Sequence, residues 1–232
     1  MPNWVNNTIT MEGKDIKSLF TKKGLLNEAE DFDYDKLIPI PTGLIDTVAG
    51  GVIAECVALY ILKKTTKKHL FEVLEEEHWL PLYLDIRSRD TKAVIEEKLR
   101  DRIGKPEMFN SDYRADPKPD RDPVEVGEYY YNLYQETGYL DWYHWCCNHW
   151  GVKWNACDCD FNGDTLYFDS PWGYPEPIYQ KLCETFPDEQ IKFRWFEEQG
   201  YWGELHNDSG FLVEDDEGFE TWDWEDEDEP TG

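Results

Sequence analysis

A cluster of histidines and cysteines is the first feature of the sequence that could do chemistry. Between residues 144 and 159 lie His144, Cys146, Cys147, His149, Cys157 and Cys159. Imidazole and thiolate groups in two close pairs suit a tetrahedral zinc site. The spacing, however, matches no common zinc finger or ribbon, and side chains of adjacent cysteines on a helix point about 100° apart. We therefore expect these cysteines to be small buried side chains, with a zinc-dependent enzyme or a metal-stabilised module as the alternative.

A second arrangement of possible ligands overlaps the end of this cluster. Asp158-x-Asp160-x-Asn162-Gly163, followed by Asp169, has the oxygen-ligand spacing of a calcium loop. An EF-hand needs a helix on each side, whereas the flanking residues here alternate between two faces as strands do. A hairpin with its turn at Asn162-Gly163 explains the same residues and is the preferred interpretation.

Motifs that would indicate catalysis are missing from the sequence. It contains no Gly-rich phosphate loop, no G-x-S-x-G motif and no H-E-x-x-H motif. Pairs of carboxylates are uninformative in a chain with 50 acidic residues. We predict a protein that is not an enzyme and that needs no cofactor.

The distribution of charge is far more informative. The 232 residues include 23 Lys and Arg against 50 Asp and Glu, for a formal net charge of −27. Residues 1–105 carry 16 basic and 18 acidic residues, a net charge of −2, so residues 106–232 carry −25. No basic residue follows Arg194. Because nucleic acid and anionic membranes bind cationic surfaces, this charge excludes both as direct partners.

The acidic residues are densest in residues 211–232, where they alternate with large aromatic side chains. Aromatic residues often anchor protein interfaces, and carboxylates steer the encounter with a basic partner. The candidate partner-binding residues are Glu214, Asp215, Asp216, Glu217, Trp222, Asp223, Trp224, Glu225, Asp226, Glu227 and Asp228. The alternative is a solvated tail that only promotes solubility.

The periodicity of apolar residues predicts the elements that position these groups. Residues 3–13 alternate as a strand, and Asp15 and Gly24 bound a short helix. Helices are then predicted at Val48–Leu62, Thr66–Trp79 and Thr91–Ile103, and across residues 124–150 with a break at Gly138. Residues 110–123, rich in proline and aspartate, are predicted to form a loop.

From residue 151 the period changes to two. Strands are predicted at 152–161 and 165–169, a helix at 175–186, and a second hairpin from 191–196 and 201–205 around Gln199-Gly200. Without the middle helices, the order is strand, helix, strand, strand, helix, strand, the split βαβ order of a ferredoxin-like sheet. We therefore predict an α+β fold: a ferredoxin-like antiparallel sheet over residues 1–210, with a helical insertion at about 42–150 and an acidic C-terminal extension, 211–232.

Several short segments carry a resemblance to a known family. They are Pro2-Asn3-Trp4 with Asn7, Leu37-Ile38-Pro39 with Pro41, Trp150-Gly151-Val152-Lys153-Trp154, Ser170-Pro171-Trp172 with Pro175 and Pro177, and Phe193 through Gly203. Together they resemble the YubB-type (Api92-like) ferredoxin-like family of phages and plasmids. Val152 and Pro171 depart from the family pattern, which has threonine and an alanine-like residue there. The resemblance implies an accessory protein of a mobile element and supplies no catalytic residues.

The cellular compartment follows from the start of the chain and its cysteines. The first residues show no secretory signal, and the most apolar stretch, Val48–Leu62, is too short to span a bilayer. Six cysteines without such a signal indicate reduced thiols rather than a disulfide framework. Combined with the resemblance, this predicts a soluble protein in the cytosol of a bacterial host.

These observations lead to one functional hypothesis. A mobile element benefits from blocking host nucleases, which hold nucleic acid in channels lined with Lys and Arg. A surface of carboxylates could occupy such a channel. The sequence therefore predicts an inhibitor that mimics nucleic acid and binds a basic host defence complex, such as a CRISPR effector or a restriction nuclease. A scaffold that binds another phage or plasmid protein without inhibiting it is the other alternative.

Overall fold

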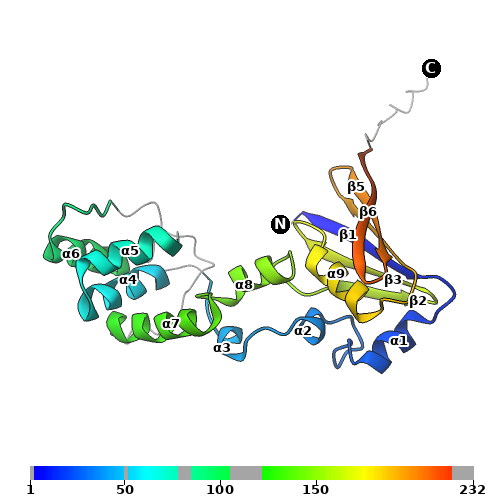
Figure 1. The fold of residues 1–232 in the computed structure, drawn as a ribbon, viewed down its shortest axis with the longest axis horizontal. Helices are drawn as coiled ribbons and strands as arrows, with labels where there is room; N and C mark the ends of the chain where they lie inside the picture. Colours follow the sequence, from blue (N-terminus) through cyan, green and yellow to red (C-terminus); the bar gives the residue numbers. More distant parts are fainter. Residues whose placement is uncertain (1–2, 50–51, 78–84, 105–121, 221–232) are drawn as a thin grey trace, which may run out of the picture. The chain divides into compact units, whose positions relative to one another are not determined.

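The chain forms two compact units, shown in the computed structural model of Figure 1. The structure describes residues 3–49, 52–77, 85–104 and 122–220. One unit, the sheet unit, contains residues 1–39 and 146–232, and the other, the helical unit, contains residues 40–145. The sequence predicts a helical insertion at about 42–150, and the helical unit contains residues 40–145.

The sheet unit is built on six antiparallel strands in the order β2-β3-β1-β4-β5-β6. The strands are β1 (Trp4–Met11), β2 (Cys157–Asn162), β3 (Thr165–Pro171), β4 (Ile191–Glu197), β5 (Tyr201–Asp208) and β6 (Phe211–Phe219). The helices of this unit are α1 (Ile16–Lys23), α2 (Tyr34–Leu37) and α9 (Glu176–Thr185). Since α1 lies between β1 and β2 in sequence and α9 between β3 and β4, the first four strands have the ferredoxin-like arrangement. The predicted α+β, ferredoxin-like fold is confirmed.

One face of this sheet carries the core. In β1 the residues alternate, with Val5, Ile9 and Met11 fully buried and the intervening side chains more exposed. Helix α9 contributes Tyr179, whose ring stacks on Phe193 of β4 with ring centroids 4.4 Å apart. Burying these aromatic and aliphatic side chains supplies most of the stability of such a layer. The strand alternation predicted for residues 3–13 is confirmed.

The β2–β3 hairpin differs in detail from the prediction. Its two turn residues are Gly163 and Asp164, because Asn162 already pairs with Thr165. Gly163 has φ +63, so it supplies the positive φ that the tight turn requires. The strand also begins at Cys157 rather than at residue 152. The predicted turn at Asn162-Gly163 is therefore wrong by one residue. Asn and Gly both tolerate positive φ, so residue type alone does not fix the turn, and the pairing register of the two strands decides its position.

The helical unit is organised around α4. Its helices are α3 (Thr42–Ile45), α4 (Ile53–Lys64), α5 (Lys67–Glu77), α6 (Lys92–Ile103), α7 (Pro123–Thr137) and the start of α8 (Trp142–His149). Helix α4 packs against α5, α6 and α7 and is buried along most of its length. The predicted break at Gly138 is confirmed, because this residue ends α7 in a left-handed conformation. Thr91, predicted as the first residue of a helix, is instead the N-terminal cap of α6. Most of the loop predicted at residues 110–123 lies outside the described residues.

No helix in the described part of the chain is both long enough and apolar enough to cross a membrane.

Candidate protein-interaction surface

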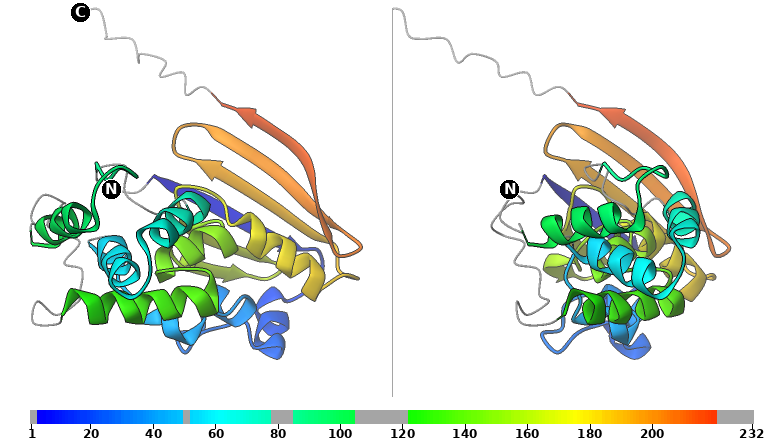
Figure 2. Two further views of the ribbon diagram at one scale, coloured as in Figure 1. Left: turned by 60° about the vertical axis from the view of Figure 1, so that its left-hand side comes forward. Right: turned by 90° about the vertical axis from the view of Figure 1, so that its left-hand side faces the viewer.

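Strands β5 and β6 form a long hairpin at one edge of the sheet. Figure 2 shows β6, coloured orange-red, running alongside β5. Ser209 and Gly210 connect them with φ values of +54 and +95, as a tight type I′ turn requires. We call residues 201–220 the acidic hairpin. Its two strands pair from Tyr201 with Phe219 to Asp208 with Phe211, with one irregularity between Glu204 and Leu205.

The acidic hairpin contains seven carboxylates and neither lysine nor arginine. Four of them, residues 214–217, are consecutive and exposed on β6. The full set is Glu204, Asp208, Glu214, Asp215, Asp216, Glu217 and Glu220. Acids on four successive residues of a strand project toward both faces of the sheet. The hairpin therefore presents negative charge on both sides of one edge.

A β-bulge distributes these carboxylates between the two faces. Glu214 pairs with Leu205 and Asp216 pairs with Glu204, so Asp215 is the extra residue. The Asp215 carboxylate contacts Nδ1 of His206 at 2.8 Å. Burial raises the pKa of Tyr174, and the negative charges of Glu176, Glu214 and Glu217 raise it further. Because α9 begins at Glu176, this interaction indicates that Glu214 and Glu217 lie near the start of that helix.

Few cations compensate these charges. Besides His206, the neighbouring strand β4 supplies two cations. Lys192 lines a hollow together with Glu204 and Asp215, and Nε of Arg194 lies 3.4 Å from a carboxylate oxygen of Glu204. Among the described residues, Glu214, Asp216 and Glu217 form no ion pair. Exposed carboxylates that form no ion pair keep most of their electrostatic field available to a binding partner.

The structure therefore changes the interpretation of part of the predicted extension. Glu214, Asp215, Asp216 and Glu217 lie in a paired strand of the sheet rather than in a tail beyond residue 210. The register also brings in two acids of β5 that the sequence analysis did not select, Glu204 and Asp208. Seven predicted partner-binding residues lie outside the described residues: Trp222, Asp223, Trp224, Glu225, Asp226, Glu227 and Asp228.

The histidines and cysteines considered as zinc ligands lie on two different elements. His144, Cys146, Cys147 and His149 lie on α8, and Cys157 and Cys159 lie on β2. The ring Nδ1 of His144 lies 2.9 Å from the Asp141 carboxylate, and this hydrogen bond raises the pKa of the histidine. Within the described residues, no three His, Cys, Asp or Glu side chains are arranged to hold a metal ion.

The thiols of the sheet and helix cores are predicted to be unreactive. Burial raises the pKa of Cys159 to about 11 and that of both Cys56 and Cys183 to about 12. At pH 8 Cys159 should react with iodoacetamide about 100-fold more slowly than it does in the protein unfolded with urea, and Cys56 and Cys183 about 1,000-fold more slowly, because only the thiolate is nucleophilic. Mass spectrometry of the alkylated protein measures this rate, and equal labelling of Cys159 in both states would contradict the prediction.

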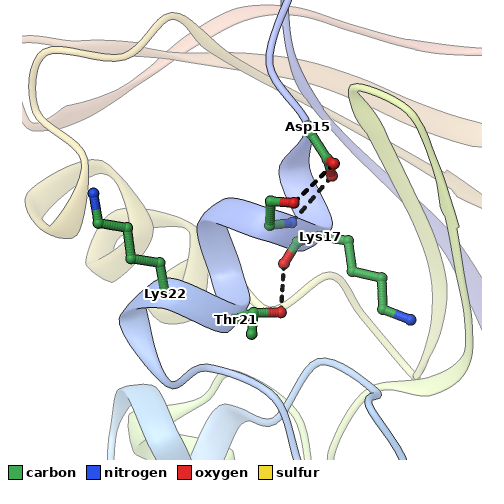
Figure 3. Close-up of a pocket in the computed structure, with 5 residues that line it drawn as sticks. Asp15, Lys17, Thr21 and Lys22 are labelled. Atoms are coloured by element: carbon green, nitrogen blue, oxygen red, sulfur yellow. Dashed lines mark hydrogen bonds between the residues drawn. The ribbon is translucent and has the colours of Figure 1, made fainter.

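Two further features have structural explanations. Asp160, Asn162 and Asp169 belong to the β2–β3 hairpin, so the flanking helices of an EF-hand are absent at these described residues. A shallow hollow beside α1 is shown in Figure 3. There Asp15 accepts hydrogen bonds from the backbone N–H and hydroxyl of Ser18, which makes it the N-terminal cap of the helix.

Comparison with known proteins agrees with this architecture. Residues 149–231 match the family described as "Ferredoxin-like domain in Api92-like protein". Over these residues the chain is similar to the Api92-like family. The match spans β2 to β6 and includes the acidic hairpin, and it confirms the resemblance predicted from the sequence.

One solved structure is similar to the chain over most of its length. The crystal structure of protein api92 from Yersinia pseudotuberculosis is 14% identical, with 95% of this chain and 99% of that chain covered and a TM-score of 0.40. No curated protein matches the chain. The family match covers strands β2 to β6 of the sheet unit and leaves β1, α1 and α2 outside it.

Proposed function

We propose that this protein is a non-catalytic binding protein whose acidic hairpin docks onto the basic surface of a nucleic-acid-binding protein. The supporting observation is the row of exposed carboxylates at residues 214–217, which lies on a paired strand with few basic neighbours. A surface already held in a paired strand loses less conformational entropy on binding than an unpaired segment would, so more of its electrostatic attraction remains as affinity.

The spacing of these charges suits a site that normally holds nucleic acid. Each strand of B-DNA carries one negative charge per roughly 3.4 Å of helix axis. A β-strand rises about 3.4 Å per residue, so four successive acids provide a similar linear density of charge. A channel lined with Lys and Arg would attract this edge as it attracts phosphates. The same charge density disfavours direct binding of nucleic acid.

The resemblance to a family of phages and plasmids suggests the class of target. If a protein of a mobile element occupied the nucleic-acid channel of an enzyme, it would inhibit that enzyme. We therefore propose inhibition of a basic host defence complex, a CRISPR effector or a restriction nuclease, in the bacterial cytosol. A purely structural scaffold would bind its partner without competing with nucleic acid, which provides the experimental distinction.

The decisive variant replaces Glu214, Asp215, Asp216 and Glu217 with the matching amides. These substitutions preserve side-chain size and remove four charges, whereas a chain ending at Gly210 would lose all of β6. We expect the intact protein to capture basic nucleic-acid-binding proteins from bacterial lysate at about 50 mM salt, and duplex DNA of about 30 base pairs to displace them. The four-amide variant should retain less than about a tenth of this material.

The matched control also removes four exposed carboxylates, but from outside the hairpin. It carries Glu12→Gln, Glu28→Gln, Glu136→Gln and Asp188→Asn, so its net charge equals that of the four-amide variant. We expect this control to capture as much as the wild type. Equal losses in both variants would reduce the effect to overall charge, and unchanged capture by the four-amide variant would contradict the proposal.

A further inference from the structure

The outer edge of β6 is a second feature of the acidic hairpin, independent of its charge. In the strand order, β6 follows β5 and has no further neighbour among the described residues. At nine residues, β6 is a long edge strand, and most of it is exposed. Such an edge carries backbone N–H and C=O groups that can pair with another chain.

The turn geometry identifies which backbone groups point outward. In a two-residue hairpin, the pair next to the turn, here Asp208 and Phe211, is hydrogen-bonded, and pairs then alternate. The backbone N–H and C=O groups of Leu212 consequently point away from β5. This agrees with the hydrogen bond from the Leu212 N–H to Oε1 of Gln180 at 2.9 Å. At the far end, the Glu220 N–H donates to the Gly200 carbonyl at 2.8 Å. When hydrogen-bonded and non-hydrogen-bonded pairs are alternated from both ends of the hairpin, the backbone N–H and C=O groups of Glu214, Glu217 and Phe219 point away from β5.

The protein covers only part of this edge. Gln180 of α9 bonds both the Gly210 carbonyl and the Leu212 N–H, so the turn end of the edge is occupied. The Glu217 N–H donates to the Asp216 carboxylate at 2.9 Å. In the described part of the chain, no side chain bonds the N–H of Glu214 or of Phe219. Within the segment from residue 213 to residue 219, the outward N–H groups of Glu214 and Phe219 are thus available for pairing.

We propose that this segment accepts an extended, basic segment of the partner protein as an additional β-strand. This inference rests on the function proposed above and specifies how the partner is held. Backbone hydrogen bonds would supply affinity, and Lys or Arg side chains opposite residues 214–217 would supply selectivity. The exposed rings of Phe211 and Phe219, 71% and 54% accessible, lie at the two ends of β6 and can contact apolar residues of the added strand.

Charge complementarity selects this occupant over a second copy of the chain. Pairing two β6 strands would place a row of four carboxylates beside an identical row, and like charges on adjacent strands are destabilising. Acidic residues on an edge thus prevent self-association. They do not prevent pairing with a basic strand, which removes the repulsion.

The test uses proline to remove one outward N–H without removing charge. Phe219→Pro deletes the outward donor, and Phe219→Ala is the matched control that loses the same ring but keeps the N–H. The probe is a synthetic peptide of about ten residues that alternates Lys and Thr, compared with a Lys–Pro peptide of equal charge that cannot pair as a strand. Fluorescence anisotropy of labelled peptide measures binding, and circular dichroism verifies that each variant is folded.

We expect the Lys–Thr peptide to bind the wild type at least about tenfold more tightly than the Lys–Pro peptide does. Phe219→Pro should weaken Lys–Thr binding about tenfold relative to Phe219→Ala. If Phe219→Pro is unfolded, Glu214→Pro compared with Glu214→Gln provides the same contrast at the second outward N–H. Equal affinity of the two peptides, or of the proline variant and its control, would overturn the edge-pairing inference. Loss of lysate capture in the four-amide variant alongside that result would leave the proposed function standing.

Discussion

Replacing Gly127 with alanine is expected to destabilise the helical unit by about 3 kcal/mol. Gly127 lies on α7 where it crosses α4, and a Cβ atom there would be 2.0 Å from the carbonyl oxygen of Cys56 and 2.6 Å from its carbonyl carbon. These are backbone atoms of a buried helix, so neither can move aside without shifting α4 and the side chains packed around it.

Thermal unfolding followed by circular dichroism measures this effect. The matched control is Gly104→Ala, at the end of α6, where the nearest atom to the added Cβ is 3.4 Å away and the backbone is right-handed helical. We expect the control to unfold within a degree or two of the wild type, since alanine fits that conformation. Similar melting curves for both variants would show that α4 and α7 can separate at little cost.

The Gly127→Ala variant also locates the binding surface. The acidic hairpin belongs to the sheet unit and Gly127 to the helical unit. We therefore expect the variant to retain the capture of basic proteins at temperatures where the sheet unit stays folded. Loss of capture on unfolding of the helical unit alone would assign binding to residues 40–145.

Replacing Asn7 with leucine is expected to destabilise the sheet unit by about 3 kcal/mol. Asn7 is fully buried beneath α9, and its side chain joins three elements. The Tyr179 hydroxyl donates to Oδ1 of Asn7 at 2.6 Å, and Nδ2 donates to Oγ of Ser170 and to the Val5 carbonyl, both at 2.8 Å. Leucine has a similar size but leaves the buried Tyr179 hydroxyl without this acceptor and removes both hydrogen bonds of Nδ2, which costs more than the added apolar contact gains.

Urea unfolding of the wild type, Asn7→Leu, Tyr179→Phe and the double variant quantifies the network. The double variant should lose less stability than the two single variants together, because it has no Tyr179 hydroxyl that is buried without a hydrogen-bond partner. The control is Asn6→Leu, one residue along β1 on the exposed face, where the change should stay within about 0.5 kcal/mol. Equal losses at both positions would contradict the role assigned to this buried network.

The same network explains residues that carry the family resemblance. Ser170 also donates its hydroxyl to the Gly173 carbonyl at 2.6 Å. This bond and the one from the Trp172 N–H to the Asn3 carbonyl flank Trp172, which has φ +74. A non-glycine residue keeps that conformation only when its surroundings fix it. The resemblance at Asn7 and at Ser170-Pro171-Trp172 thus has a packing and turn explanation.

Much of the fold could be predicted from local signals in the sequence. The alternation in β1, the caps at Asp15 and Thr91, and the left-handed glycines at Gly24 and Gly138 all act within a few residues of their own position. Backbone stereochemistry and one-sided burial impose such patterns directly. They were sufficient for the order of elements and the ferredoxin-like arrangement of β1 to β4.

The candidate site depended on the tertiary structure. Residues 211–219 show no clear alternation because four consecutive acids interrupt it, so only pairing with β5 reveals a strand. Pairing is non-local, and the sequence of one strand does not state which partner it will find. For the same reason, regular spacing of His144, Cys146, Cys157 and Cys159 did not determine whether they converge. Local chemistry thus determined what each segment can form, and contacts between distant segments decided that the acidic residues 214–217 lie on the edge strand of the sheet.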